Sequence, residues 1–291
     1  MTTPAEAPLE APDLPYVDPR RYADTRRRGR RNGLIAAIST VVVFSVLLVA
    51  ITSAPGWPAV QESFFDWNAA VEAWPTVIRA FVLNIKIFLI AEVFILVFSL
   101  LIALARGLKG PVFLPLRILA TVYVDFFRGV PTILLILLLG FGVPALRLPG
   151  IPNSELVWGT VALILSYSAY VSEVYRAGID SVHPSQRAAA RSLGLSALQA
   201  TRFVVLPQAI RRVVPPLLND FIALQKETAL VSILGPVEVL RAAQIEVSSN
   251  FNYTPYVVAA LLFVALTLPL TRLTDWLQQR AARRRSASGV S

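Results

Sequence analysis

The sequence predicts an all-α integral membrane protein with about six transmembrane helices and one cytoplasmic helix-turn-helix loop. Three observations support this class: the composition, a series of long apolar segments, and one ordered polar segment between them. Hydrophobic residues make up 55% of the 291 residues and charged residues only 15%, with a mean hydropathy of +0.62. Soluble domains carry about 25% charged residues. A chain of this composition therefore buries its apolar surface in lipid.

Long apolar segments define the expected spans, because a helix needs roughly 20 mostly apolar residues to cross the hydrocarbon core. The six segments are residues 34–51, 77–104, 113–143, 157–177, 213–234 and 256–273. The third segment is long enough that we expect a kink at Gly129 or Pro131. The first follows an arginine-rich run but is longer than the apolar core of a signal peptide, so we expect a retained anchor.

The placement of positive charge orients these spans. Cations gather within residues 20–31, 106–117, 187–212 and 280–285, all on one side of a six-span arrangement. The connections on the other side contain only two cations, Arg147 and Arg241, within residues 53–75, 142–154 and 235–254. The positive-inside rule therefore predicts that both termini and the long loop are cytoplasmic. Because the spans explain the basic charge, we expect no nucleic-acid partner.

Composition also divides the chain. We expect residues 1–32 to be a disordered, basic, cytoplasmic N-terminus, since their first part is rich in Pro, Ala and acidic residues without periodicity. Residues 33–54 form the first transmembrane helix, and residues 76–277 the main transmembrane domain, with its loop at about 180–212. Residues 278–291 are a basic cytoplasmic tail.

The loop carries the signals of two short helices. Pro184 suits a first helical turn, and Gly194 stands where a left-handed residue would end that helix. Ser196 and Gln199 have the spacing of a capping box, which predicts a second helix. Leu206 precedes Pro207 and is disfavoured in helical geometry, so we expect this second helix to be short.

The loop resembles the EAA loop of importer permeases in the ATP-binding cassette superfamily, specifically the polar amino acid branch. The matching residues are Gln186, Ala189, Ala190, Arg191, Leu193, Gly194, Leu206 and Pro207. Ala188 stands where the family has its signature glutamate. Residues 127–131 are similar to the family segment Phe-Arg-Gly-Thr-Pro, and residues 170–179 and 226–230 are similar to its flanking spans.

The resemblance implies five shared spans plus one extra N-terminal span, in a multi-pass protein of the bacterial plasma membrane. It implies a permease subunit that imports a polar amino acid with two cytoplasmic ATPase subunits, a second permease that is the same or homologous, and an extracytoplasmic solute-binding protein. The residues expected to couple this chain to the ATPase are Gln186, Arg187, Ala188, Ala189, Ala190, Arg191, Leu193, Gly194 and Pro207. ATP and Mg would be hydrolysed by the partners, with no cofactor bound by this chain.

Ionisable and polar residues at membrane depth are the candidate substrate path, because unpaired charge there is costly unless it faces the bundle interior or a watery cavity. They are Glu92, Ser172, Glu173, Asn219, Asp220, Lys226, Glu227 and Thr228. Asn219 with Lys226, and Asp220 with Glu227, stack on two adjacent faces of one helix. Two interpretations stay open: a direct role on the path, or internal ion pairing of Lys226 with Glu173, Asp220 or Glu227.

Several classes of function lack their motifs. The sequence has no Gly-x-x-x-x-Gly-Lys-Ser/Thr phosphate loop, so we expect no ATPase activity in this chain. The lone His183 has no partners for a metal or nucleophile site, and we expect no catalytic residue and no metal. The alternatives are a permease for another small polar solute, a non-transporting membrane scaffold, and an ion-driven transporter, although no internal repeat supports the last.

Overall fold

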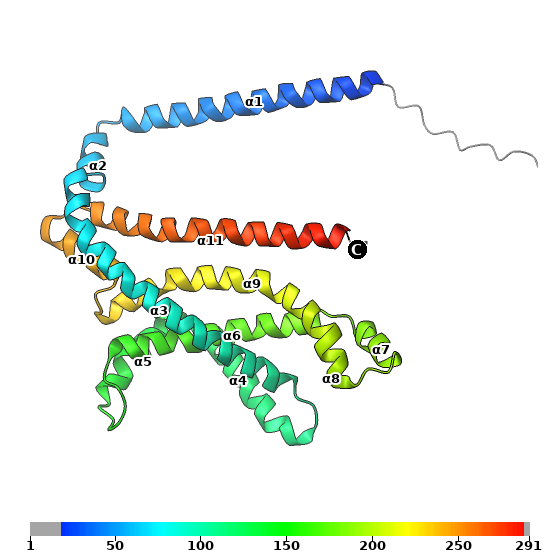
Figure 1. Ribbon diagram of the computed structural model, residues 1–291. Helices are drawn as coiled ribbons and strands as arrows, with labels where there is room; N and C mark the ends of the chain where they lie inside the picture. Colours follow the sequence, from blue (N-terminus) through cyan, green and yellow to red (C-terminus); the bar gives the residue numbers. More distant parts are fainter. Residues whose placement is uncertain (1–18, 288–291) are drawn as a thin grey trace, which may run out of the picture. The chain divides into compact units, whose positions relative to one another are not determined.

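The computed structural model describes residues 19–287, with side chains described for residues 32–280. It divides into two units, Met1–Val60 and Gln61–Ser291. Over the described residues every regular element is helical (Figure 1). The predicted all-α fold is thus confirmed.

The first unit is dominated by one long helix, α1 (Pro19–Thr52). Its apolar part, Asn32–Thr52, is long enough to cross a membrane, and none of it is buried. The hydroxyl groups of Ser39 and Thr40 donate to the Ala36 carbonyl at 3.0 and 2.7 Å, so these polar side chains need no partner outside the helix. The predicted disorder of residues 1–32 is wrong from Pro19 onward, because arginine is a good helix former and continues the helix. Residues 1–18 lie outside the described residues.

Helix α2 (Trp57–Phe64) crosses the boundary between the units. The second unit continues with α3 (Trp67–Gly107), η1 (Pro111–Phe113), α4 (Leu114–Gly129), α5 (Thr132–Ala145), α6 (Glu155–Asp180), α7 (Pro184–Ser192), α8 (Ala197–Ala200), η2 (Thr201–Val205), α9 (Leu206–Glu227), η3 (Thr228–Leu234), α10 (Val239–Asn250) and α11 (Thr254–Ala287). Helix α11 includes most of the predicted tail, and residues 288–291 are not described.

The predicted spans correspond to four long helices and two broken ones within the described chain. The helices are α1, α2 with α3, α6 and α11; the bent pairs bring the number of possible spans to six. The segment Pro111–Gly129 meets Thr132–Ala145 at 102°, so the expected kink beside Gly129 is instead a sharp break. The segment Ala197–Leu234 meets Val239–Asn250 at 52°.

Helix α6 forms the centre of the second unit. Its buried residues Leu163 and Tyr167 pack with Ile95 of α3, Ile136 of α5 and Leu224 of α9 in the larger apolar core. A second core joins α3 to α10 and α11. Helix α3 belongs to both cores, and Figure 1 shows it running diagonally through this unit. It starts at Trp67, ten residues before the predicted span, because Asp66 caps it by accepting from the Asn68 amide at 2.8 Å.

Candidate coupling loop and translocation path

The polar loop forms the two short helices that its sequence predicts. Pro184 begins α7, and Gly194 follows it with φ +87°, in the left-handed region where glycine is favoured. Ser196 accepts from the Gln199 amide at 3.2 Å, and the Gln199 side chain accepts from the Ser196 amide at 2.8 Å. This reciprocal capping box fixes the start of α8.

The expectation at Leu206 is wrong. Leu206 has helical geometry, φ −60° and ψ −44°, and α8 runs through the π-helical turn η2 into α9 without a break. In η2 the Leu206 amide donates to the Thr201 carbonyl, five residues back. This wider turn makes room for Pro207, which has no amide proton of its own to donate. The second helix of the loop is therefore the beginning of a long membrane-directed helix.

Most of the expected coupling residues are open to a partner. The exposed ones are Gln186, Arg187, Ala188, Ala189, Arg191, Leu193, Gly194 and Pro207. Leu193 is 85% exposed and Leu198, just after the capping residue, 78%. Ala190 differs, because it is only 5% exposed and faces the interior of the loop. The loop thus presents cations beside apolar side chains, the combination that a protein partner can cover.

The base of the loop is fixed to the bundle by close contact of α6 with α9. A Cβ atom on Gly178 would lie 2.0 Å from Val213 Cγ2, so only glycine permits this approach. The Arg212 guanidinium donates to the Ser181 carbonyl at the end of α6. Val182, Val205 and Ala209 form a small buried cluster below the loop. A displacement of the loop must therefore move both helices.

Glu173 does not line a free cavity. Its carboxylate is paired with Arg106 at the end of α3 and, at 3.1 Å, with Arg176 on its own helix. The side chains of Arg106 and Glu173 are 15% and 20% exposed. We call this α3–α6 contact the Arg106–Glu173 clamp. Ser172 beside it is fully buried and donates to the Ala169 carbonyl at 2.8 Å, as a small residue at a helix contact does.

Helix α9 carries the two predicted polar faces. Asn219 and Lys226 are exposed, whereas Asp220 and Glu227 are partly buried. One buried carboxylate oxygen of Asp220 and one of Glu227 have no hydrogen-bond partner within the described chain. Lys226 forms no ion pair with any described carboxylate, so the internal pairing of Lys226 is not seen. Each of these two carboxyl groups thus keeps one oxygen for a partner, water or solute.

Glu92 of α3 joins this acidic face. It lies close enough to Asp220 for the two carboxyl groups to repel each other, and Tyr167 of α6 interacts with Glu227. Lys86 is exposed and, over the described residues, forms no ion pair. Lys86 therefore does not neutralise Glu92. Helices α3, α6 and α9 bring polar groups to one region of the bundle.

A fully buried polar network was missed by the sequence reasoning. The Asn84 amide of α3 donates to Glu238 Oε2 at 2.8 Å and to Thr228 Oγ1 at 3.2 Å, and its oxygen accepts from the Val239 amide at 3.0 Å. Glu238 Oε1 caps α10 by accepting from the Arg241 amide at 2.8 Å. Thr228, expected on the path, thus has a structural partner. A lone asparagine inside an apolar span was the available signal.

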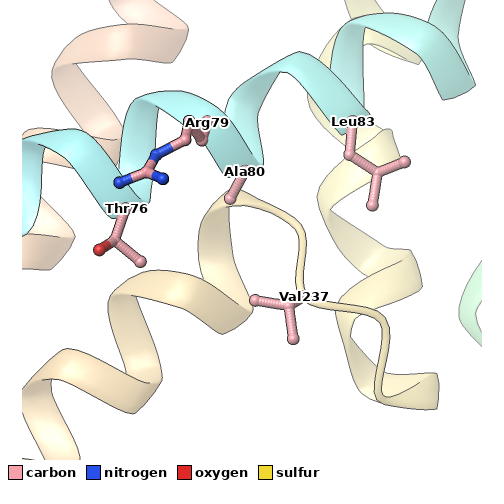
Figure 2. A pocket seen from close by; sticks show the side chains of 5 residues that line it. All are labelled: Thr76, Arg79, Ala80, Leu83 and Val237. Atoms are coloured by element: carbon pink, nitrogen blue, oxygen red, sulfur yellow. The ribbon is translucent and has the colours of Figure 1, made fainter.

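A cavity of about 410 Å³ lies between α3 and the connection from η3 to α10 (Figure 2). It is lined by Thr76, Arg79, Ala80 and Leu83 of α3 and by Val237 of the connection. The Arg79 Nε donates to the Pro75 carbonyl at 2.8 Å. None of these residues was among the predicted site residues.

The fold and these sites define a class: a multi-pass helical membrane protein with polar groups between its spans and an ordered, exposed polar loop. The chain belongs to the family described as binding-protein-dependent transport system inner membrane component, whose model matches residues 113–283. A solved structure titled "Crystal structure of an amino acid ABC transporter with histidines" is 33% identical, with a TM-score of 0.67 over 74% of this chain and 98% of that chain.

Two relatives from Bacillus subtilis (strain 168) agree with this family. The "Probable amino-acid permease protein YxeN" is 35% identical over 211 residues, which cover 72% of this chain and 93% of the relative. The "Probable glutamine ABC transporter permease protein GlnM" is 37% identical over 196 residues, covering 66% and 88%. The predicted resemblance to amino acid importer permeases is confirmed.

Proposed function

We propose that this chain is the transmembrane permease subunit of an ATP-driven importer that moves a polar amino acid into the cytoplasm. The similarity to amino acid permeases over most of their length supports the solute class. Two separate ATPase subunits supply the energy and hydrolyse ATP with Mg, since the chain has no phosphate loop of its own. A second permease and an extracytoplasmic solute-binding protein complete the importer.

The observation that carries this proposal is the exposed loop fixed to two helices of the bundle, one of which carries the candidate path residues. Helix α6 leads into it and α9 leads out, and α9 carries Asp220 and Glu227. When ATP draws the two ATPase subunits together, the loop transmits this motion to the bundle through the contact of Gly178 with Val213. The path then opens alternately to each side. The orientation follows from the cation placement, with the loop and both termini in the cytoplasm.

Docking is tested on the importer reconstituted with its ATPase and binding protein. Gly194→Pro cannot adopt the φ of +87° and should misplace α7 against α8, so we expect loss of ATPase co-purification and of uptake. Arg187→Gln with Arg191→Gln leaves the backbone intact and should weaken binding of the ATPase. Arg272→Gln, an exposed cation on α11, is the matched control. Full complex formation by the loop variants would contradict the assignment.

The scaffold alternative makes a different prediction. A scaffold needs the loop but has no use for Asp220, Lys226 and Glu227 in the spans. Neutral substitutions Asp220→Asn, Lys226→Gln and Glu227→Gln should reduce ATP-dependent uptake of labelled glutamine or histidine while the ATPase stays bound. Unchanged uptake would remove these residues from the path, and absence of uptake by the unmodified importer would favour the scaffold or another solute.

A further inference from the structure

The geometry points to a carboxylate-binding subsite at Arg79 and Thr76, which holds the α-carboxylate of the amino acid at the extracytoplasmic mouth of the path. The inference rests on the proposed import of an amino acid. It assigns a role to the cavity of Figure 2, whose lining includes no residue of α9.

The position of Arg79 along α3 places it at a membrane surface. The stretch from Arg79 to Arg106 is about 40 Å long at roughly 1.5 Å per residue, whereas the hydrocarbon core is about 30 Å thick. Both cations belong to the one unbroken helix α3, so they lie at opposite surfaces. Arg106 lies on the side predicted to be cytoplasmic, and Arg79 therefore meets solute arriving from outside.

The hydrogen-bonding groups at this end of the cavity are available. Arg79 uses only its Nε, which donates to the Pro75 carbonyl, and no described carboxylate lies within ion-pair distance of its guanidinium. Thr76, one helical turn away, has a hydroxyl group without a partner in the described chain. Figure 2 shows the guanidinium folded along the helix on the Thr76 side of the cavity. A planar guanidinium beside a hydroxyl is suited to a carboxylate.

The opposite wall of the cavity is held in place by the buried network. Val237 immediately precedes Glu238, whose carboxylate accepts from Asn84 and caps α10. Asn84 follows Leu83, another lining residue, and also accepts from the Val239 amide. These bonds fix the connection against α3, so the cavity is formed before a ligand arrives. A site formed in advance loses less entropy on binding.

The remaining walls fit an amino acid. Ala80, Leu83 and Val237 give a short apolar surface for carbon atoms next to the carboxylate, and a volume of about 410 Å³ accommodates a small molecule. A lipid phosphate could meet the same guanidinium, but the similarity of this chain to amino acid permeases favours a solute that carries a carboxylate of its own. The amino acid is therefore the occupant we assign.

The test is equilibrium binding to the complete permease–ATPase complex in nanodiscs, without the solute-binding protein. The probes are labelled L-glutamine and L-histidine, each compared with its carboxamide, in nanodiscs of phosphatidylcholine alone or with phosphatidylglycerol. Arg79→Gln should raise the Kd for the amino acid roughly ten- to hundredfold. It should abolish the preference for the acid over the carboxamide, because that preference comes from this contact.

Two further variants separate binding from folding. Thr76→Val removes one hydroxyl and should raise the Kd by a smaller factor, and Arg79→Lys should retain part of the preference for the acid. Lys86→Gln, on the same helix but outside the cavity, is the control and should match the unmodified protein. All variants are compared by size-exclusion profile and unfolding temperature.

The outcomes are distinguishable. If the unmodified complex binds and imports an amino acid while Arg79→Gln and Lys86→Gln keep the same acid preference, the subsite is refuted and the importer remains. An Arg79→Gln effect seen only with phosphatidylglycerol would assign the site to lipid and refute it equally. If the unmodified importer neither binds nor transports any amino acid, the proposed function itself fails.

Discussion

At the scale of single residues, the Arg106–Glu173 clamp is the contact whose loss has the clearest expected consequence. Glu173→Gln leaves Arg106, whose side chain is only 15% exposed, without its partner, whereas Arg106→Gln leaves Glu173 still paired with Arg176. We expect Glu173→Gln to lower the free energy of unfolding by about 1–2 kcal/mol. This is less than the loss expected on breaking a fully buried pair, because both side chains are partly exposed. Arg106→Gln should cost less, and the double variant should recover part of the Glu173→Gln loss.

The unmodified protein, the two single variants and the double variant form a double-mutant cycle, which is measured by thermal unfolding. Asp180→Asn is the matched control, because its partner Arg176 is on the same helix and both side chains are exposed, at 61% and 45%. Such an exposed pair contributes about 0.3–0.5 kcal/mol. If Glu173→Gln instead weakened solute binding at unchanged stability, Glu173 would be a ligand of the substrate, as the sequence suggested.

Residue patterns predicted local features better than distant ones. The spacing of Ser196 and Gln199 predicted a local capping box, and the structure shows both of its hydrogen bonds. Glu173 was predicted to lie on the substrate path or to pair with Lys226, whereas its partner in the structure, Arg106, lies 67 positions away along the chain. Asn84 and Glu238 are 154 positions apart, and neither shows by itself that the other exists. Contacts of this kind are set by helix packing, which one sequence does not specify.

At the scale of elements, the contact of α6 with α9 transmits motion only if the two helices stay close. Gly178→Ala places a methyl group where Val213 Cγ2 already lies, and Val213 is branched at Cβ and cannot turn away freely. We expect a loss of about 1–3 kcal/mol, the usual cost of overpacking. Adding Val213→Ala should restore part of it. Gly142→Ala in α5, with no atom within 4 Å of the added Cβ, is the control and should be neutral or stabilising.

Two measurements report on the contact of α6 with α9. Unfolding temperature measures the packing, and the ratio of solute imported to ATP hydrolysed measures the transmission. If Gly178→Ala lowered neither while the protein assembled normally, the close approach would have no part in the mechanism. The start of α9 shows how a local rule can fail. Pro207 was expected to keep the second helix of the loop short, but the π-turn η2 accommodates the proline and the helix continues into α9.

At the scale of the whole molecule, the second unit should work without α1. The apolar part of α1 buries none of its residues, so removing residues 1–52 exposes no described core. The cations of residues 106–117, 187–212 and 280–285 remain, and they all favour the same side. We therefore expect the shortened chain to keep its unfolding temperature, its ATPase partner and its uptake.

Two C-terminal fusions measure the orientation of the shortened chain. A green fluorescent protein should stay fluorescent and an alkaline phosphatase should stay inactive, because both results report a cytoplasmic C-terminus. An active phosphatase would show that α1 sets the topology, whereas lost uptake with normal stability and orientation would show that α1 contacts another subunit of the importer.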